Sequence, residues 1–331
     1  MDAEVVPTLR RDSRKSKVAG KKVRPLDITV LMGGPSNERE VSLDSGSAVA
    51  EGLRRRGHQV TTADINPQDV TALDRQGIDV VFIALHGDFG ESGEVQELCE
   101  RRGLAYVGSG PKASALAMDK VLSKEAFRSV GLATPDWAVL SPQTAAERAE
   151  GLARVGLPCV VKPIDGGSSV GVTIARHAAA RDAAIQDLLD TPTYVGAMVE
   201  GFVAGREMTV GILGEQALPP IEIRTAREFY DYTAKYQDDA TQYLLDSGLS
   251  PETVLGLQSA AVAAHTVLGC RDFSRVDFIL AADGRAWVLE INTIPGFTDH
   301  SLLPKAAAAV GIAFDELCER IVEMALKRWK G

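Results

Sequence analysis

Hydrophobic and polar residues alternate along the N-terminal third of the chain in short segments separated by Gly-rich turns. A period of two predicts strands, and a period near 3.6 predicts helices. The pattern predicts strands at 26–32, 59–63 and 80–85, a helix at 36–56 and another through Cys99. Strands that alternate with helices predict an α/β unit whose parallel sheet is covered on both faces. Ligands bind beyond the C-terminal ends of such strands, so we expect the loops after the first and third strands to share one edge.

The remainder of the chain predicts an α+β arrangement. A helical region ends near Gly131, and Ala133-Thr134-Pro135 is interpreted as a linker into a second unit. We expect strands at 159–163, 170–175 and 197–200, a helix at 178–189, and a helical region at 302–330 interrupted at Gly311. Residues 225–249 are polar and Tyr-rich, which is typical of a functional loop or lid.

Two alternating segments, 273–280 and 287–291, are joined by an Asp-Gly turn, which predicts a hairpin. Side chains in a strand point alternately to opposite faces. We therefore expect Trp287, Leu289 and Ile291 to face a core.

The opposite face of this hairpin carries oxygen ligands. Glu290 and Asn292 share it, and folding the hairpin brings Asp277 and Arg275 to the same face. Mg²⁺ prefers oxygen ligands and takes the rest of its shell from phosphates and water. The alternative is a solvated face with ordinary surface charges. The adjoining Asn-Thr-x-Pro-Gly loop differs from a plain turn and favours a site.

Composition is that of a soluble globular protein, with 45% hydrophobic and 24% charged residues among 331. There is no apolar run of membrane-spanning length and no secretory signal, so we expect a cytoplasmic protein. The four cysteines are widely spaced, which favours buried thiols over a disulfide framework or a zinc site.

Charge is unevenly distributed. Residues 1–24 contain eight basic and three acidic residues, which gives this segment a net charge of +5. The whole chain has a net charge of −9, so the residues after 24 carry a net charge of −14. Without aromatic residues or an amphipathic period, this segment is interpreted as a disordered tail rather than a nucleic-acid or membrane arm. The acidic remainder argues against nucleic acid as the main partner.

A Gly-rich loop, residues 166–171, lies between two predicted strands and offers backbone N–H groups and hydroxyls without bulk. Such a loop suits a flap over phosphates, and Lys162 adds a point charge, although a plain hairpin turn is nearly as good an interpretation. The spacing of the classical phosphate-binding loop is absent.

Part of this loop, residues 167–171, also matches the G-x-S-x-G motif of serine hydrolases. Asp277 and His300 follow in the chain order of a triad. The motif requires a strand that leads into a helix, whereas residues 170–175 are β-branched and apolar, so we reject this alternative.

Two further features are ambiguous by themselves. Glu200 and Glu207 flank a turn at a strand end, where carboxylates could accept hydrogen bonds from an adenine amino group or a ribose, or could be ordinary surface charges. Residues 229–236 contain three tyrosines and suit a lid that excludes water, or an aromatic anchor for a surface loop.

Together these motifs closely resemble the D-alanine–D-alanine ligase family of ATP-grasp enzymes. The similarity runs from about Asp27 to the C-terminus and rests on segments 33–42, 86–91, 118–120, 167–171, 229–236, 275–277 and 290–302. The resemblance implies a three-domain ATP-grasp fold. Its units would be an N-terminal α/β domain with the first D-alanine site (25–118), a central domain (119–210) and a C-terminal domain (211–331).

The resemblance also implies ATP between the central and C-terminal domains. Phosphate, flap, base and ribose contacts would come from Lys120, Lys162, Gly167, Ser168, Ser169, Glu200, Val203, Glu207 and Lys235. Two Mg²⁺ ions, which Mn²⁺ could replace, would be held by Asp277, Glu290 and Asn292.

By the same resemblance, Glu38 would bind the ammonium group of the first D-alanine, with His86 nearby. Ser168 and Tyr236 would link to Glu38 and close flap and lid. Ser301 and Leu302 would hold the carboxylate of the second D-alanine. Arg275 and the Gly296 N–H would stabilise the oxyanion of the peptide-forming step.

The implied activity is ATP-dependent joining of two D-alanines through a D-alanyl phosphate, for peptidoglycan synthesis, by a homodimer. Alternatives are the same mechanism with D-serine, D-lactate or a secondary-metabolite precursor as acceptor, or a nucleotide-binding protein without catalysis. Tyr236 favours an amine acceptor. The chain departs from the family pattern at residues 244–249, which puts the shape of the far end of the lid in doubt, and at Asp88-Phe89 in the His86 loop.

Overall fold

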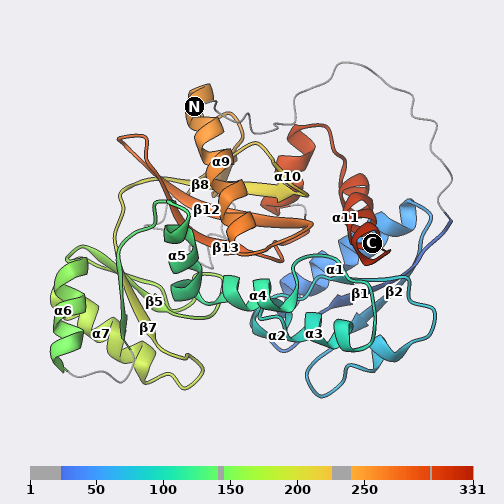
Figure 1. Cartoon of the computed structure of the whole chain (residues 1–331), viewed down its shortest axis with the longest axis horizontal. Coiled ribbons are helices and arrows are strands. Elements are labelled where there is room, and N and C mark those ends of the chain that lie inside the picture. Colours follow the sequence, from blue (N-terminus) through green and yellow to red (C-terminus); the bar gives the residue numbers. More distant parts are fainter. Residues whose placement is uncertain (1–23, 141–144, 226–239, 299, 331) are drawn as a thin grey trace.

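The computed structural model describes residues 24–140, 145–225, 240–298 and 300–330. Within these ranges, three separate sheets organise the chain (Figure 1). The predicted tail, apart from Arg24, and the Tyr-rich segment 229–236 lie outside the described residues.

The N-terminal sheet is parallel, as predicted. Its order is β2-β1-β3, formed by β1 (Asp27–Met32), β2 (Gln59–Asp64) and β3 (Val80–Ile83). Ile28 and Val30 belong to one hydrophobic cluster, and Leu31 belongs to another on the opposite face. Helices α1 (Arg39–Arg55) and α11 (Phe314–Lys330) contribute to the first cluster, and α3 (Glu94–Arg101) contributes to the second. Both faces are therefore covered.

Several connections in this unit differ from the predicted pattern. The loop after β3 contains a short helix, α2 (Asp88–Glu91), and residues 71–74 form the 3-10 helix η1 (Thr71–Asp74). The predicted helical region before Gly131 is two helices, α4 (Pro111–Met118) and α5 (Lys120–Ser129). The break occurs because Asp119 is extended and its carboxylate accepts hydrogen bonds from the N–H groups of Val121 and Leu122, both at 2.9 Å.

The central sheet is antiparallel with the order β4-β7-β5-β6. Its strands are β4 (Trp137–Leu140), β5 (Cys159–Pro163), β6 (Thr173–Ala175) and β7 (Ala197–Gly201), accompanied by α6 (Ala145–Val155) and α7 (Ala178–Leu189). The strand predicted at 170–175 is shorter than expected. Ser168 and Ser169 adopt left-handed backbone angles (φ 52° and 58°), and the turn that they begin continues to Gly171. The Gly-rich loop thus leads into a strand, not a helix, which removes the basis for a nucleophile elbow.

The C-terminal sheet has the order β11-β10-β8-β12-β13, with β9 paired to β8. Its strands are β8 (Gly205–Leu213), β9 (Gln216–Ala217), β10 (Ile221–Arg224), β11 (Gln242–Leu244), β12 (Phe273–Ala281) and β13 (Ala286–Asn292). The helices are α9 (Pro251–Val267), α10 (Leu302–Ala309) and α11. Strand β11 lies inside the segment predicted to be a loop. Strand β8 runs through the predicted domain boundary at residue 210, so we propose to place that boundary before β8.

The β12–β13 hairpin forms as predicted, but its face assignment is partly wrong. Val288 and Ile291 are in the core, whereas Trp287 is only half-buried and Leu289 lines a cavity. The pairing shifts between Asp277 and Phe278, which leaves one extra residue on β13. Such a bulge reverses the alternation, so side chains before and after it follow different parities. Sequence alternation alone does not reveal this.

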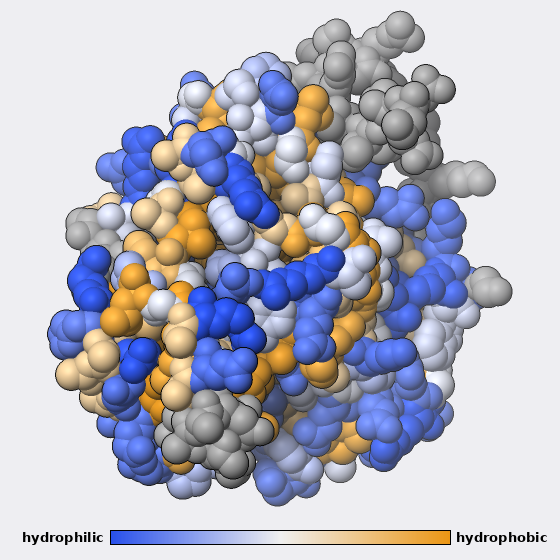
Figure 2. Space-filling view, turned by 60° about the vertical axis from the view of Figure 1, so that its left-hand side comes forward, coloured by the Kyte–Doolittle hydropathy of each residue, from blue (hydrophilic) through white to orange (hydrophobic). Residues whose placement is uncertain are grey.

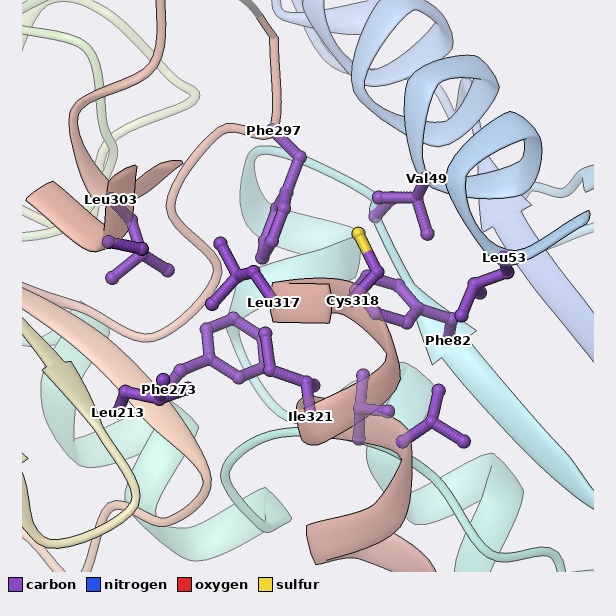
Figure 3. Close-up of a cluster of buried hydrophobic side chains, with 14 of the residues drawn as sticks. Val49, Leu53, Phe82, Leu213, Phe273, Phe297, Leu303, Leu317, Cys318 and Ile321 are labelled. Carbon is purple, nitrogen blue, oxygen red and sulfur yellow. The ribbon is translucent and has the colours of Figure 1, made fainter. Parts of the chain in front are cut away.

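A cluster of buried aromatic and aliphatic side chains joins the N-terminal unit to the C-terminal sheet (Figure 3). Phe297 is completely buried and meets Phe82, Phe273 and Phe314 edge-on, with ring centroids 5.5, 5.6 and 6.4 Å away. Edge-to-face pairs of this kind add to the free energy gained by burial. Phe297 directly follows the Pro-Gly loop, so this packing fixes the end of that loop.

Hydrophilic and hydrophobic residues are interspersed on the face shown in Figure 2. No helix in the described ranges is both long and apolar enough to cross a membrane. The four cysteines are buried free thiols, in agreement with the sequence-based expectation.

Phe297→Ala should lower the free energy of unfolding by about 3–5 kcal/mol, because it removes a ring packed against three others and leaves a cavity. Urea unfolding of wild type and variant measures the change. Val195→Ala, at a side chain that is 79% exposed, is the control and should shift stability by less than about 0.5 kcal/mol. Equal effects of the two substitutions would contradict the assignment of Phe297 to a shared core.

Candidate active site

Two adjoining cavities lie where the three sheets meet. The larger, of about 610 Å³, is bordered by the N-terminal unit, the Gly-rich loop and the end of β13. The smaller, of about 150 Å³, lies between the central and C-terminal sheets. Lys120, Gly166, Gly167 and Glu290 line both cavities, which form one continuous site.

The hairpin brings its predicted polar residues together. Asp277 pairs with Glu290 and Arg275 with Asn292 across β12 and β13. Arg275 donates to both carboxylate oxygens of Asp277, at 3.0 and 2.8 Å, and the Thr209 hydroxyl donates to Asp277 at 2.6 Å. Asp277 therefore fixes the orientation of the Arg275 guanidinium group, with Arg275 lining the larger cavity and Asp277 the smaller.

The predicted metal ligands form a small, oxygen-only set. Within the described ranges, no group of three or more His, Cys, Asp or Glu side chains is arranged to hold a metal. Asp277, Glu290 and Asn292 instead offer two carboxylates and an amide oxygen, and the Asn292 oxygen is oriented by the Ile294 N–H at 2.8 Å. This donor set fits Mg²⁺, which keeps several water ligands and binds substrate phosphates. It would not suffice for a closed structural site.

The Gly-rich loop reaches the N-terminal unit. The Ser168 hydroxyl donates a hydrogen bond to the Glu38 carboxylate, as the resemblance implied. A Cβ atom at Gly167 would lie 3.4 Å from that carboxylate, so a larger side chain there would crowd the contact. The Lys120 ammonium group donates to the Gly166 carbonyl at 2.6 Å and lies 3.9 Å from Glu290. The third partner, Tyr236, and Lys235 lie outside the described residues.

A buried group of charges forms one wall of the smaller cavity. Glu200 pairs with Lys162 at 2.5 Å and with Lys124 at 2.9 Å. Burial acts to raise the carboxyl pKa of Glu200, but the two ammonium groups outweigh it and lower that pKa to about 2. Burial lowers the pKa of Lys124 to about 8 against the opposing effect of Glu200. Sequence reasoning missed Lys124, because a lysine in a helix is typical of a solvated face.

Three more predicted nucleotide contacts line the smaller cavity, whereas Ser168 lines the larger one. Ser169, Val203 and Glu207 are present in the smaller cavity with apolar side chains from both sheets, including Ile174, Phe202, Ile279 and Leu289. An apolar slot with a few polar groups suits a flat aromatic base. Ser169 lines this cavity, whereas His300, the third residue of the rejected hydrolase triad, lines the other.

His86 is held from both sides in the larger cavity. Its Nδ1 lies 3.4 Å from Glu91, and its Nε2 lies 3.3 Å from the Ser45 hydroxyl, which accepts from the Phe297 N–H at 3.1 Å. Burial raises the pKa of Glu91, and His86 opposes that shift. Ser45 and Glu91 were not assigned roles from the sequence, because only the fold brings Ser45 beside the loop after β3.

The predicted acceptor end also lies in the larger cavity, where Gly296, Ser301 and Leu302 form part of its lining. The Ser301 hydroxyl accepts from the Thr298 N–H at 2.9 Å. A Cβ atom at Gly296 would lie 2.7 Å from the Ser301 hydroxyl oxygen, so a larger residue there would displace that hydroxyl group.

Comparisons with known proteins agree on one family. The family models described as D-ala D-ala ligase C-terminus and D-ala D-ala ligase N-terminus match residues 126–323 and 68–109. A D-alanine–D-alanine ligase from Anaeromyxobacter dehalogenans strain 2CP-1 is 45% identical over 89% of this chain and 96% of its own length. One from Synechococcus sp. strain JA-3-3Ab is 43% identical over 92% and 94%.

Solved structures give the same result. The D-alanine–D-alanine ligase from Bacillus anthracis complexed with ATP has a TM-score of 0.81 and 34% identity, covering 93% of this chain and 99% of the other. The VanG D-Ala:D-Ser ligase from Enterococcus faecalis also has a TM-score of 0.81, with 28% identity over 91% and 100%.

The stability contribution of Glu200 should depend on pH. Its folded pKa of about 2 is below the ordinary value of 4.5, so its stabilisation is complete above 4.5 and is lost as pH falls towards 2. Glu200→Gln leaves two buried lysines without a carboxylate and should cost about 3–5 kcal/mol at pH 7. Urea unfolding at pH 7, 4 and 3 should show that the difference in free energy of unfolding between wild type and Glu200→Gln becomes smaller as pH falls. A difference that is constant with pH would contradict this pairing.

Proposed function

The chain belongs to the D-alanine–D-alanine ligase family, and we propose that it joins two D-alanine molecules, using ATP and releasing ADP and phosphate. The observation that carries this proposal is the Ser168–Glu38 hydrogen bond. It connects the Gly-rich loop beside the nucleotide cavity to the carboxylate that suits an amino acid ammonium group. A phosphoryl donor and an amino acid bound on either side of it would be neighbours.

The smaller cavity suits the nucleotide. Its apolar walls accept a flat base, Glu200 and Glu207 offer carboxylate acceptors, and Lys162 and Lys120 supply positive charge for the phosphates. The Gly-rich loop adds backbone N–H groups above them. Lys235, by the resemblance alone, would reach the terminal phosphate.

Asp277, Glu290 and Asn292 would hold Mg²⁺, with Mn²⁺ as a possible replacement. When bound, the metal neutralises negative charge on the phosphates. In our proposal two ions would share these three residues. Phosphate oxygens and water would supply the remaining ligands of each ion.

The first D-alanine would occupy the part of the larger cavity near Glu38 and His86. Glu38 pairs with its ammonium group, which directs its carboxylate towards the phosphates. A carboxylate oxygen forms a bond to the terminal phosphorus as the bond to ADP breaks, giving D-alanyl phosphate. This activation is needed because a free carboxylate has no good leaving group for attack by an amine.

The second D-alanine would be held through its carboxylate by Ser301 and Leu302. Its amine attacks the acyl carbon, a tetrahedral oxyanion forms, and phosphate leaves. Arg275 and the Gly296 N–H are the donors for that charge, and one such donor is worth about 3 kcal/mol in the transition state. Asp277 keeps the Arg275 fork in place before substrate arrives, which avoids the cost of orienting it during the reaction.

D-Alanine is the acceptor that the relatives of this chain support best. The sequence relatives at 45% and 43% identity are D-alanine–D-alanine ligases, whereas the D-Ala:D-Ser ligase is 28% identical. The product would enter peptidoglycan synthesis. A homodimer and a cytoplasmic location are further parts of the proposal and rest on the family relationship.

Purified protein with ATP, Mg²⁺ and D-alanine should release ADP in step with dipeptide formation. Coupled measurement of ADP, with chromatography of the dipeptide, tests this. D-Alanine with D-serine or D-lactate should give mainly D-alanyl-D-alanine. A mixed product in excess would favour the alternative acceptor, and absence of D-alanine-dependent ADP release would overturn the proposal.

Glu290→Gln should reduce kcat by at least about 100-fold, because it removes a negatively charged ligand from the proposed metal site. It should also raise the Mg²⁺ concentration needed for half-maximal rate. Asp283→Asn, at the exposed turn of the same hairpin, is the matched control and should leave both quantities unchanged. An unchanged Mg²⁺ dependence in Glu290→Gln would remove Glu290 from the metal site.

A further inference from the structure

Lys124 is a completely buried lysine that the proposed mechanism does not use. It lies on α5, one helical turn beyond Lys120. Its ammonium group is 2.9 Å from Glu200, donates to the Thr134 hydroxyl at 2.5 Å, and lies 5.5 Å from the centre of the Trp137 ring. An ammonium group costs several kcal/mol to bury even when paired, whereas an apolar side chain of similar length would fill the same space without that cost. The charge therefore calls for a role beyond packing.

The contacts of Lys124 form a chain between the two walls of the smaller cavity. The Thr134 hydroxyl accepts a hydrogen bond from Lys124 and donates one to the Val288 carbonyl at 2.8 Å. Val288 belongs to β13, and the next two residues, Leu289 and Glu290, line the cavity. In the other direction the chain runs through Glu200 on β7 to Lys162 on β5. One ammonium group thus connects the C-terminal wall to the central wall.

These contacts also set the net charge beside the proposed nucleotide site. Glu200 alone would neutralise Lys162, because the two groups pair at 2.5 Å. With Lys124 behind the carboxylate, the three groups carry a net charge of +1, and Lys162 and Glu200 line the cavity while Lys124 does not. Inside a protein this difference acts over the length of a triphosphate with little screening.

We propose that Lys124 is a positioning residue for the nucleotide, which orders Glu200 for the base and sets the separation of the two walls without touching the nucleotide itself. The inference rests on the proposed function. The nucleotide that Glu200 would select is an adenine nucleotide. An ionised carboxylate accepts a hydrogen bond from the 6-amino group of adenine and repels the 6-oxo group of hypoxanthine.

Lys124→Met tests this with ADP and Mg²⁺ as the probe, by titration calorimetry of the full chain. ADP affinity should fall at least about tenfold and IDP affinity by much less, so that the preference for ADP over IDP shrinks. In steady-state assays KM for ATP should rise while KM for D-alanine changes less than about twofold. A purely structural role would lower the melting temperature but leave base preference and this KM contrast unchanged.

Arg128→Met is the matched control. Arg128 lies one turn further along α5 and stacks on the same Trp137 ring, but it pairs with Asp136 at the surface. ADP and IDP affinities should equal those of wild type. If Arg128→Met weakens ADP as much as Lys124→Met does, the effect belongs to the helix and not to the buried ammonium group, and the proposal is overturned.

A double-mutant cycle keeps the proposal testable if Lys124→Met folds poorly. In Glu200→Gln the carboxylate is already neutral, so adding Lys124→Met should change base preference little, and the two effects should be strongly non-additive. Thr134→Val leaves both charges and breaks only the link to Val288, and should weaken ADP by about threefold. Additive effects in the cycle, or unchanged ADP binding in both Lys124→Met and Thr134→Val, overturn the inference.

These measurements separate the inference from the proposed function. If wild type binds ADP and makes dipeptide while Lys124→Met binds ADP equally well, the inference fails and the function stands. If wild type binds ADP with the expected base preference but makes no dipeptide, the function fails while Lys124→Met still tests nucleotide positioning.

Discussion

Backbone pairing between β12 and β13 is the constraint on which the site depends. The register places Asp277 opposite Glu290 and Arg275 opposite Asn292, so four polar side chains meet without any flexible loop. The bulge adds a second effect, because it turns Leu289 to the same cavity as Glu290. In the proposed function, one hairpin thereby supplies the oxygen ligands, a guanidinium group and an apolar contact for the base, on a scaffold that hydrogen bonds hold rigid.

The hairpin is anchored at its far end by packing. After Asn292 the chain passes through the Pro-Gly loop to Phe297, whose ring is inserted among aromatic side chains of the N-terminal unit and α11. Since Gly296 immediately precedes this anchor, the N–H group assigned to the oxyanion cannot move without disturbing the core. Ser45 ties the same backbone to His86. The end of the site proposed to bind the amino acids is therefore fixed by apolar burial and one hydroxyl group.

Much of this arrangement was predictable from the chain, and the failures have identifiable causes. Alternation and turn residues found the parallel sheet, the hairpin and the meeting of Asp277 with Glu290. Alternation failed at Trp287 and Leu289, because a bulge depends on tertiary pairing and leaves no local signal. The strand predicted after the Gly-rich loop was too long, because the left-handed backbone at Ser168 and Ser169 outweighed the β propensity of the residues that follow. Lys124 was missed because a buried ion pair is defined by partners distant in sequence.

The two ends of the site are attached by different forces. Phe297 and its neighbours form one hydrophobic cluster shared by the N-terminal unit and the C-terminal sheet, whereas the central sheet has a cluster of its own. Within the described residues, its links at the cavity are polar: Ser168 to Glu38, Lys120 to Gly166, and Lys124 between Glu200 and Thr134. Apolar burial resists separation over large areas, but a few hydrogen bonds contribute only about 1 kcal/mol each. The central sheet is thus the wall whose position is set by charge, and an anionic nucleotide is the ligand best able to influence it.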